Sequence, residues 1–409
     1  MISTIAVLGT LDTKGVEIGF LAEQIRRCGC ATLVVDLGVL GPPAFTPDIP
    51  RETVARAAGG DLRALASAGD RGQAVAAMAL GIGEVIRDLH GQGRIQAVVG
   101  MGGSAGTTMA TAAMRALPLG VPKVMVSTVA GGDVSAFVGA SDITMVPSVV
   151  DVSGLNRISR QVIARAASAV AAMVRTEVQE SEDGPLVAAS MFGNTTQCID
   201  AARATLESAG IEVLVFHATG AGGRTMESLV AAGFITGILD VTTTELADEL
   251  AGGVMSAGPD RLMAAARAGI PAVVAPGCLD MVNFWAPESI PGKYRDRRFY
   301  RHNPSVTLMR TTPAENRELG RRLAERVNAS TGPAAVYLPT GGISAISAPG
   351  QPFHWPEADE ALFHSIRSGL RSGITVMEVD ANINDPAFSD AVAGGLLQML
   401  GHRPGMRTA

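Results

Sequence analysis

The chain has 409 residues, of which 47% are hydrophobic and 18% are charged, and its formal net charge is −6. This composition excludes an intrinsically disordered chain, and the negative charge argues against a general nucleic-acid-binding surface. The length exceeds that of one typical domain core, so we expect two domains.

The sequence also argues against a membrane-spanning or secreted protein. Its first eight residues have no basic start and no small-residue cleavage site, and they are typical of a first strand. No apolar run reaches the roughly 18 residues that a membrane helix needs. The four cysteines form no C-x-x-C pair and no zinc-type spacing with histidine. We expect a cytoplasmic protein without contact to a membrane.

Strand and helix patterns alternate through the first part of the chain. The expected elements are a strand at 2–8, a helix at 16–27, a strand at 31–37, helices at 52–58 and 73–89, strands at 95–99, 121–126 and 143–146, and a helix at 155–174. The helix assignments rest on apolar residues that recur on one face. We expect these elements to form a first domain over residues 1–178.

An acidic stretch at 179–185 is the predicted linker, because it is poor in apolar residues and ends in Gly-Pro. A second domain at 186–409 follows, with expected strands at 186–190, 213–216, 235–239, 270–275, 305–308, 334–338 and 375–379 and helices at 197–208 and 226–232. Alternation of this kind predicts an α/β fold with parallel sheets and right-handed crossovers.

Short loops rich in Gly, Ser and Thr follow the apolar runs in both parts. They lie at 9–14, 100–107, 127–132, 192–196, 219–225 and 340–344. In an open α/β sheet, ligands bind just past the carboxyl ends of the strands, where such loops present N–H groups and hydroxyls to an anion. The pattern predicts a phosphate- or carboxylate-bearing small ligand in a cleft between two domains.

The first loop, at 9–14, carries an Asp, two Thr hydroxyls and a Lys, although it lacks the spacing of a Walker A loop. Lys14 is suited to neutralise a phosphate, and Asp12 is suited to hold a magnesium ion. The alternative is structural, with Asp12 or Thr13 as a helix cap and Lys14 as a solvated residue. Asp36, at the end of the second strand, is either a ribose acceptor or a solvated loop residue.

The second loop satisfies G-x-G-x-x-A at Gly100–Ala105, after a strand and before a helix. A dinucleotide site would also need an acid about 20 residues later. No Asp or Glu occurs between Thr107 and Gly132, so the pattern disfavours NAD. A phosphate cradle at the start of the helix and a purely structural turn both remain open.

The second domain carries candidates for binding and for acid–base chemistry. Arg224 follows a glycine loop and is suited to grip a carboxylate or phosphate. Its neighbours Gly222 and Gly223, with Asn194 from the preceding Gly-Asn-Thr turn, complete the expected substrate-binding set. The expected catalytic residues are His217, His302 and Asp240. A structural role for each histidine is the alternative, and no G-x-S-x-G motif points to acyl hydrolysis.

Several segments together resemble a known family. They are 9–14, 100–108, 123–130 and 151–157, with 193–196, 220–223 and 302–304 in the second part. The set is similar to the Tm-one-like ATP-binding domain family, an uncharacterised bacterial and fungal family related to the amino-terminal region of the tomato mosaic virus resistance protein. The resemblance implies two Rossmann-like domains and ATP bound mainly by the first. It carries over to Gly9, Thr10, Asp12, Thr13, Lys14, Gly102, Gly103, Ser104, Gly106, Thr107 and Thr128 as expected ATP contacts.

The leading hypothesis is a cytoplasmic protein of small-molecule metabolism that binds ATP and Mg²⁺ on the loops of the first domain. One alternative is a lyase or hydrolase of a sugar-acid derivative that needs no nucleotide. Another is a module that senses ATP and contacts a partner protein. We also expect a homo-oligomer, because symmetric dimers are the commonest assembly.

Overall fold

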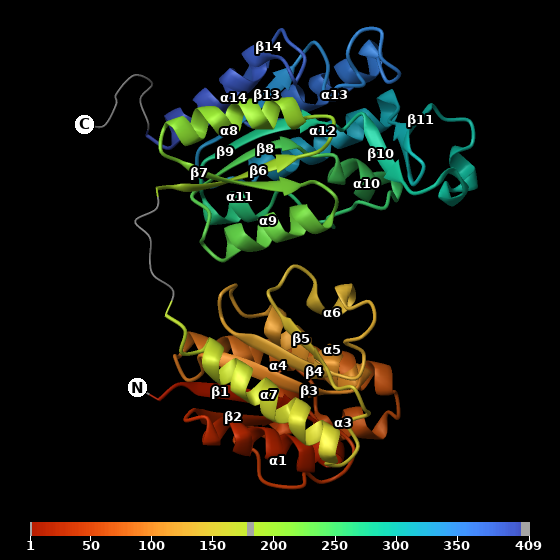
Figure 1. Cartoon of the computed structure of the whole chain (residues 1–409). Helices are drawn as coiled ribbons and strands as arrows, with labels where there is room; N and C mark the ends of the chain where they lie inside the picture. The colour runs from red at the N-terminus through yellow and green to blue at the C-terminus, as the bar shows by residue number, and fades with distance from the viewer. Residues whose placement is uncertain (1, 178–183, 402–409) are drawn as a thin grey trace. The chain divides into compact units, whose positions relative to one another are not determined.

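The computed structural model describes residues 2–177 and 184–401. Their contacts divide the chain into two units, unit 1 (Met1–Glu180) and unit 2 (Ser181–Ala409). In each unit, helices cover both faces of a parallel sheet, so the predicted α/β class with two Rossmann-like domains is confirmed (Figure 1). Most of the predicted linker, residues 179–183, lies outside the described residues. The cleft expected between the domains stays a prediction.

The sheet of unit 1 has five parallel strands in the order β2-β1-β3-β4-β5. These strands are β1 (Thr4–Gly9), β2 (Ala31–Asp36), β3 (Ala97–Gly102), β4 (Lys123–Ser127) and β5 (Thr144–Pro147). Their carboxyl ends are in register, since Gly9 pairs with Asp36 and Leu8 pairs with Gly100. The order reverses between β1 and β3, which is where a doubly wound fold binds its ligand.

Seven helices of unit 1 surround this sheet. They are α1 (Leu11–Arg27), α2 (Arg51–Ala57), α3 (Leu62–Ser67), α4 (Arg71–Gly91), α5 (Ser104–Arg115), α6 (Ser135–Val138) and α7 (Arg157–Met173). One apolar core lies between the sheet and α1 and α7, and the other lies between the sheet and α2, α4 and α5. The sequence did not predict α3, which has no buried residue and therefore no apolar face to reveal it.

Unit 2 contains a six-stranded parallel sheet in the order β14-β13-β9-β8-β6-β7. These strands are β6 (Leu186–Met191), β7 (Glu212–His217), β8 (Gly237–Thr242), β9 (Ala272–Gly277), β13 (Ala334–Pro339) and β14 (Thr375–Val379). The helices are α8 (Thr196–Ser208), α9 (Ala221–Ala231), α10 (Glu245–Ala251), α11 (Ala264–Ala268), α12 (Pro313–Asn328), α13 (Pro356–Gly369) and α14 (Pro386–Met399). Helices α8 and α14 pack on one face, and the others pack on the opposite face.

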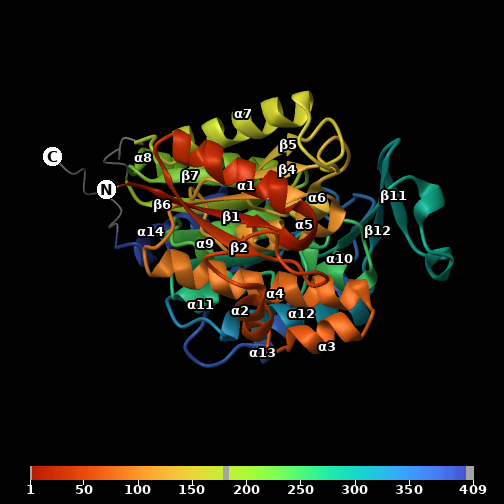
Figure 2. The same ribbon diagram turned by 90° about the horizontal axis from the view of Figure 1, so that it is seen from below.

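A second, antiparallel sheet of unit 2 was not expected from the sequence. Strands β10 (Met281–Phe284), β12 (Val306–Arg310) and β11 (Phe299–Asn303) pair in that order. Both views show this sheet at the edge of unit 2 (Figures 1 and 2). The sequence pattern predicted no strand at 299–303, where β11 lies. The basic residues of β11 hid the strand, because they lie on an exposed edge strand.

Within residues 2–177 and 184–401, no helix combines the length and the apolar character needed to cross a membrane. All four cysteines are free thiols. No group of three or more His, Cys, Asp or Glu side chains that could hold a metal ion occurs among the described residues.

Candidate functional site

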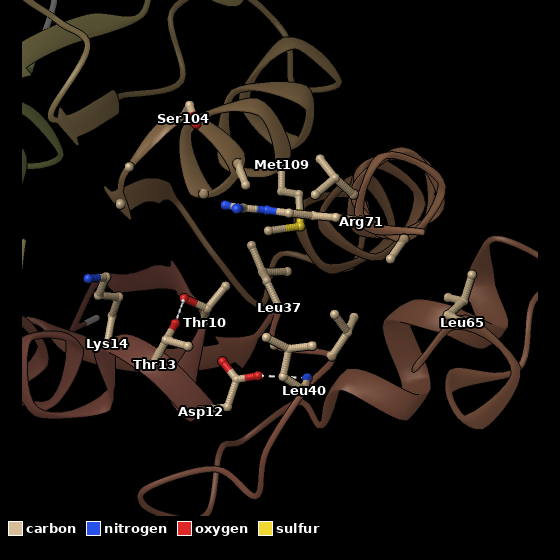
Figure 3. A pocket seen from close by; sticks show the side chains of 18 of the residues that line it. Thr10, Asp12, Thr13, Lys14, Leu37, Leu40, Leu65, Arg71, Ser104 and Met109 are labelled. Atoms are coloured by element: carbon tan, nitrogen blue, oxygen red, sulfur yellow. Dashed lines mark hydrogen bonds between the residues drawn. The ribbon is translucent and has the colours of Figure 1, made fainter. Parts of the chain in front are cut away.

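A pocket of about 530 Å³ lies in unit 1 at the carboxyl ends of β1 and β3 (Figure 3). Its wall is built by the β1–α1 turn, the β2–α2 loop, the α3–α4 segment and the β3–α5 turn. The lining residues are Thr10, Asp12, Thr13, Lys14, Leu37, Gly38, Val39, Leu40, Leu65, Ala66, Gly69, Asp70, Arg71, Ala74, Val75, Gly102, Gly103, Ser104, Ala105, Gly106, Met109 and Asp151. The pocket thus occupies the point where the strand order reverses.

The first turn of α5 forms one part of the wall. Gly103 precedes the helix, and no side chain caps the N–H groups of its first turn. A β-carbon on Gly102 would lie 3.0 Å from the α-carbon of Gly106, so the glycine lets the strand end approach the helix closely. Uncapped amides and the positive end of the helix dipole favour an anion at this place.

The first turn of α1 supplies polar groups to the same pocket. The hydroxyls of Thr10 and Thr13 are 2.7 Å apart and hydrogen-bonded to each other. Lys14 leaves the helical conformation (φ −128°, ψ 21°), and its ammonium group donates to the carbonyl oxygen of Val152. This kink places the only lysine of the pocket lining at its polar end (Figure 3).

Asp12 is nearly enclosed, with 3% of its side chain exposed. Its Oδ2 accepts a 2.8 Å hydrogen bond from the N–H of Leu40. Its Oδ1 is buried and has no hydrogen-bond partner among the described residues. The nearest cation, Nη1 of Arg51, is 3.9 Å from Oδ2. One carboxylate oxygen is therefore without a partner beside the pocket, at a cost in free energy unless a partner binds there.

The other end of the pocket is apolar. Its aliphatic and thioether side chains belong to Leu37, Val39, Leu40, Leu65, Ala74, Val75 and Met109. The guanidinium group of Arg71 extends from the start of α4 into the pocket between Leu37 and Met109 (Figure 3). Arg71 was not predicted, because the apolar pattern indicated a helix start at residue 73, whereas α4 begins at Arg71.

Eight of the twelve predicted ATP-site residues line the pocket. They are Thr10, Asp12, Thr13, Lys14, Gly102, Gly103, Ser104 and Gly106. The structure therefore brings together two loops that are about ninety residues apart in the sequence. Whether they bind ATP stays a prediction.

The other four predicted residues do not line the pocket. Gly9 is buried, and a β-carbon there would lie 2.2 Å from Cδ1 of Ile18, so this glycine lets α1 pack on the sheet. The buried Thr107 exchanges a 2.6 Å hydrogen bond with the hydroxyl of Ser127. Thr128 is exposed, and its N–H donates to the carbonyl oxygen of Gly102. Each of these three therefore has a structural contact, and a binding role stays a prediction.

Asp36, the fourth of these residues, is completely buried. Its Oδ1 accepts hydrogen bonds from the N–H groups of Leu11 (2.9 Å) and Gly38 (2.8 Å). Burial raises the pKa of its carboxyl group above the usual value, although these two bonds and nearby Arg51 act in the opposite direction. Asp36 thus fastens the β1–α1 turn to the β2–α2 loop.

In unit 2, the carboxylate of Asp240 is enclosed by internal partners. The guanidinium group of Arg261 grips it with bonds of 2.5 and 2.7 Å, and the hydroxyl of Ser190 donates to it at 2.6 Å. Neither Asp240 nor Arg261 has an exposed side chain. Catalysis by Asp240 stays a prediction, and it would require a substrate to reach this closed cluster.

The glycine loop before α9 holds an internal carboxylate. Oε1 of Glu245 accepts hydrogen bonds from the N–H groups of Gly220 (2.7 Å) and Gly223 (3.1 Å), and Oε2 of Glu245 accepts from Nε of Arg261 (2.5 Å). A β-carbon on Gly222 would lie 2.0 Å from the carbonyl oxygen of His217, so packing alone requires this glycine. Substrate binding by Gly222 and Gly223 stays a prediction, although the carboxylate of Glu245 already fills the loop.

The remaining predicted residues of unit 2 are dispersed. His217 is exposed and stacks on Phe192, with ring centroids 5.3 Å apart. His302 is exposed on β11, and Arg224 donates to the carbonyl oxygen of Ser256. Asn194 is buried, and its carbonyl oxygen accepts from the side chain of Asn384. Within residues 184–401, no hydrogen bond joins His217 or His302 to Asp240.

Comparison with known proteins assigns the whole described chain to one family. The amino-terminal domain of the uncharacterised protein family UPF0261 matches residues 3–179, and its carboxyl-terminal domain matches residues 184–400. The chain belongs to the UPF0261 family. UPF0261 proteins of Clostridium tetani and Rhizobium meliloti are each 46% identical to it, and the alignments cover 97% and 95% of this chain and 98% and 96% of the relatives.

The tomato relatives of UPF0261 confirm the resemblance inferred from the motifs. The ToMV susceptible protein tm-1(GCR26) of Solanum lycopersicum is 37% identical over 96% of this chain, which spans 55% of the tomato protein. The ATP-binding part of that resemblance stays a prediction. Among solved structures, the UDP-N-acetylglucosamine 2-epimerase of Rickettsia bellii is a partial match, 10% identical over 67% of this chain and 78% of the epimerase. Its TM-score of 0.22 carries no inference about ligands or activity.

Proposed function

We propose that unit 1 binds a nucleoside polyphosphate, specifically ATP, in the pocket at the carboxyl ends of β1 and β3. The observation that carries the proposal is the arrangement of two chemically different ends in one pocket. The uncapped first turn of α5 and the ammonium group of Lys14 form a cationic end. Leucine, valine and methionine side chains form the other end.

These two ends favour a nucleotide over a smaller anion. The volume of about 530 Å³ lies in the range of small-molecule sites, which is about 300–1,000 Å³. Inorganic phosphate would use the cationic end only and leave the aliphatic end in contact with water. A nucleotide places its phosphates on the α5 amides and buries its base against Leu37, Leu40 and Leu65, which adds a hydrophobic contribution.

A magnesium ion fits the polar end. Magnesium on a nucleotide is usually held by one or two carboxylates together with phosphate oxygens, and it keeps several waters. Asp12 offers one such carboxylate, and its Oδ1 is the buried oxygen without a partner. In this proposal Asp12 holds the ion, which supplies positive charge to the phosphates.

Isothermal titration of the full chain with ATP and Mg²⁺ tests the proposal. We expect a single site whose affinity falls by about tenfold or more in Lys14→Ala, since hydrogen bonds to charged groups contribute about 1.5–3 kcal/mol. Lys293→Ala is the matched control, because Lys293 lies in unit 2 and is exposed. No heat of binding in the unaltered chain, or equal affinities in both variants, would contradict the proposal.

The same preparation separates the broader alternatives. ATP binding followed by consumption of ATP with a small-molecule substrate would support a role in metabolism. Tight ATP binding without turnover would favour a sensing module. Activity on a sugar acid that survives removal of ATP but is lost in His302→Ala would favour the nucleotide-independent lyase or hydrolase.

A further inference from the structure

Arg71 is an arginine whose charge has no partner in the described part of the chain. It is the first residue of α4, and the preceding Asp70 caps the helix by accepting a 3.0 Å hydrogen bond from the N–H of Gln73. Among residues 2–177 and 184–401, no hydrogen bond or salt bridge involves the Arg71 side chain. Arg51 of α2 and Arg115 of α5 differ, because Arg51 donates to the carbonyl oxygen of Gly41 and Arg115 donates to that of Phe137.

The position of the Arg71 side chain is also specific. Its guanidinium group points into the pocket, with the apolar side chains of Leu37 and Met109 near it, although the residue as a whole is exposed (Figure 3). A guanidinium group in such surroundings is stabilised by a bidentate anion or by an aromatic plane. No aromatic residue is among the described residues that line the pocket, so a bound anion is the partner that fits this guanidinium group.

The order of groups along the pocket indicates which part of a nucleotide would meet Arg71. In Figure 3 Lys14 lies at one end, Leu65 lies at the other, and the guanidinium group of Arg71 lies between them. A nucleotide with its base beside Leu65 and its last phosphate toward Lys14 places its first phosphate near this middle position.

We propose that Arg71 binds the phosphate nearest the nucleoside, while Lys14 binds the phosphates farther along the chain. This inference rests on the proposed function. It adds a second cation to the pocket, and this cation comes from the start of α4, not from a loop that follows a strand. It makes Arg71 a binding residue that distinguishes nucleotides from nucleosides. Its ligand class is therefore any nucleotide with at least one phosphate on the sugar.

Titration with adenosine, AMP, ADP and ATP, the last two with Mg²⁺, tests the assignment. In Arg71→Ala we expect weaker binding of AMP, ADP and ATP by a common factor of about 10 to 100, as for a hydrogen bond to a charged group. Adenosine binding should not change. In Lys14→Ala only ADP and ATP should weaken. Arg63→Ala is the matched control, because Arg63 is an exposed arginine of α3 outside the pocket lining.

The outcomes separate this inference from the proposed function. Because Arg71 is exposed and makes no protein contact through its charge, we expect Arg71→Ala to fold, and an unchanged circular dichroism spectrum checks this. Unchanged nucleotide affinities, or adenosine affinity that falls as much as AMP affinity, would overturn the role of Arg71 alone. Failure of the unaltered chain to bind any of the four compounds would overturn the proposed function as well.

Discussion

The two units use similar glycine-rich loops in opposite ways. In unit 1, the first turn of α5 has no side-chain cap and faces a pocket. In unit 2, the N–H groups of Gly220 and Gly223 at the start of α9 hydrogen-bond to the carboxylate of Glu245. Both loops are rich in glycine and both follow a parallel strand. The comparison teaches that such a loop creates an anion site, whereas the rest of the fold decides whether a ligand or a side chain occupies it.

Arg261 holds the internal carboxylate of unit 2 in place. Its completely buried guanidinium group binds both Asp240 and Glu245, and these carboxylates raise the pKa of Arg261 well above its usual value although burial alone would lower it. Unit 1 has no equivalent arrangement at the α5 loop among its described residues. There the pocket lining contains two cations, Lys14 and Arg71, and no described carboxylate accepts a hydrogen bond from the first-turn amides of α5.

The largest expected effect comes from removing the buried cation of unit 2. Arg261→Ala leaves Asp240 and Glu245 buried without their partner, so we expect a loss of about 3–5 kcal/mol in the free energy of unfolding. Urea unfolding followed by tryptophan fluorescence measures it, because both tryptophans, Trp285 and Trp355, belong to unit 2. Arg267→Ala, which breaks an exposed pair with Asp260, should cost at most about 1 kcal/mol. Equal losses in the two variants would contradict the central role of Arg261.

A β-carbon on each glycine loop tests the comparison next. In Gly223→Ala the new atom would lie 2.2 Å from Oε2 of Glu245, so we expect a loss of about 1–3 kcal/mol from overpacking. In Gly103→Ala the nearest atom is 3.7 Å away, so the stability should change little. The measurement is the same urea unfolding for Gly223→Ala and circular dichroism for Gly103→Ala. A Gly223→Ala protein as stable as the unaltered chain would show that Glu245 does not fill the loop tightly.

The stability of unit 2 should also depend on pH in a defined direction. Burial raises the pKa of Asp248 to about 7 and that of Asp280 to about 6 from an ordinary value of 3.8. The folded state therefore keeps these protons to higher pH than the unfolded chain. Unit 2 should lose stability as the pH rises from about 4 to about 7 through these two groups.

Asp248→Asn provides the control for this pH dependence, because asparagine is neutral at every pH. The fall in stability between pH 4 and pH 7, measured by urea unfolding and tryptophan fluorescence, should become shallower in this variant. A slope identical to that of the unaltered chain would show that Asp248 does not titrate in this range.

The smallest expected effect concerns the wall of the unit 1 pocket. Helix α3 has no buried residue and lies between Gly59 and Gly69, both at positive φ (73° and 66°). Because Leu65 of α3 lines the pocket, ATP should slow tryptic cleavage after Arg63 by a few-fold, since cleavage follows local opening. Cleavage after the exposed Arg301 of unit 2 is the internal standard. Equal slowing at both sites would point to an effect on trypsin instead of on α3.

Local residue patterns predicted much of unit 1. Apolar runs followed by Gly-Thr or Gly-Gly-Ser turns located β1, β3 and the loops that meet at the pocket, because strand ends of a parallel sheet share one edge. The same reasoning could not separate Asp12, which lines the pocket, from Asp36, which is closed off by two backbone N–H groups. That difference depends on contacts between loops that are distant in the sequence.

The features that the sequence did not reveal are mostly tertiary. Glu245 was visible as an acid after a strand, but its reach into the α9 loop depends on Arg261, which lies in an irregular segment. Arg71 was not among the predicted site residues, because the predicted helix began at residue 73. The sequence pattern did not reveal the antiparallel sheet, because its edge strand β11 is short and basic and therefore resembles a surface loop.

A crystal structure of the full chain with a non-hydrolysable ATP analogue and Mg²⁺ is the most direct measurement. We expect the phosphates on the backbone amides of Ser104, Ala105 and Gly106 in unit 1, while Glu245 still occupies the amides of Gly220 and Gly223 in unit 2. An analogue bound at the α9 loop with Glu245 displaced, or a unit 1 pocket that takes no analogue at saturating concentration, would contradict the account.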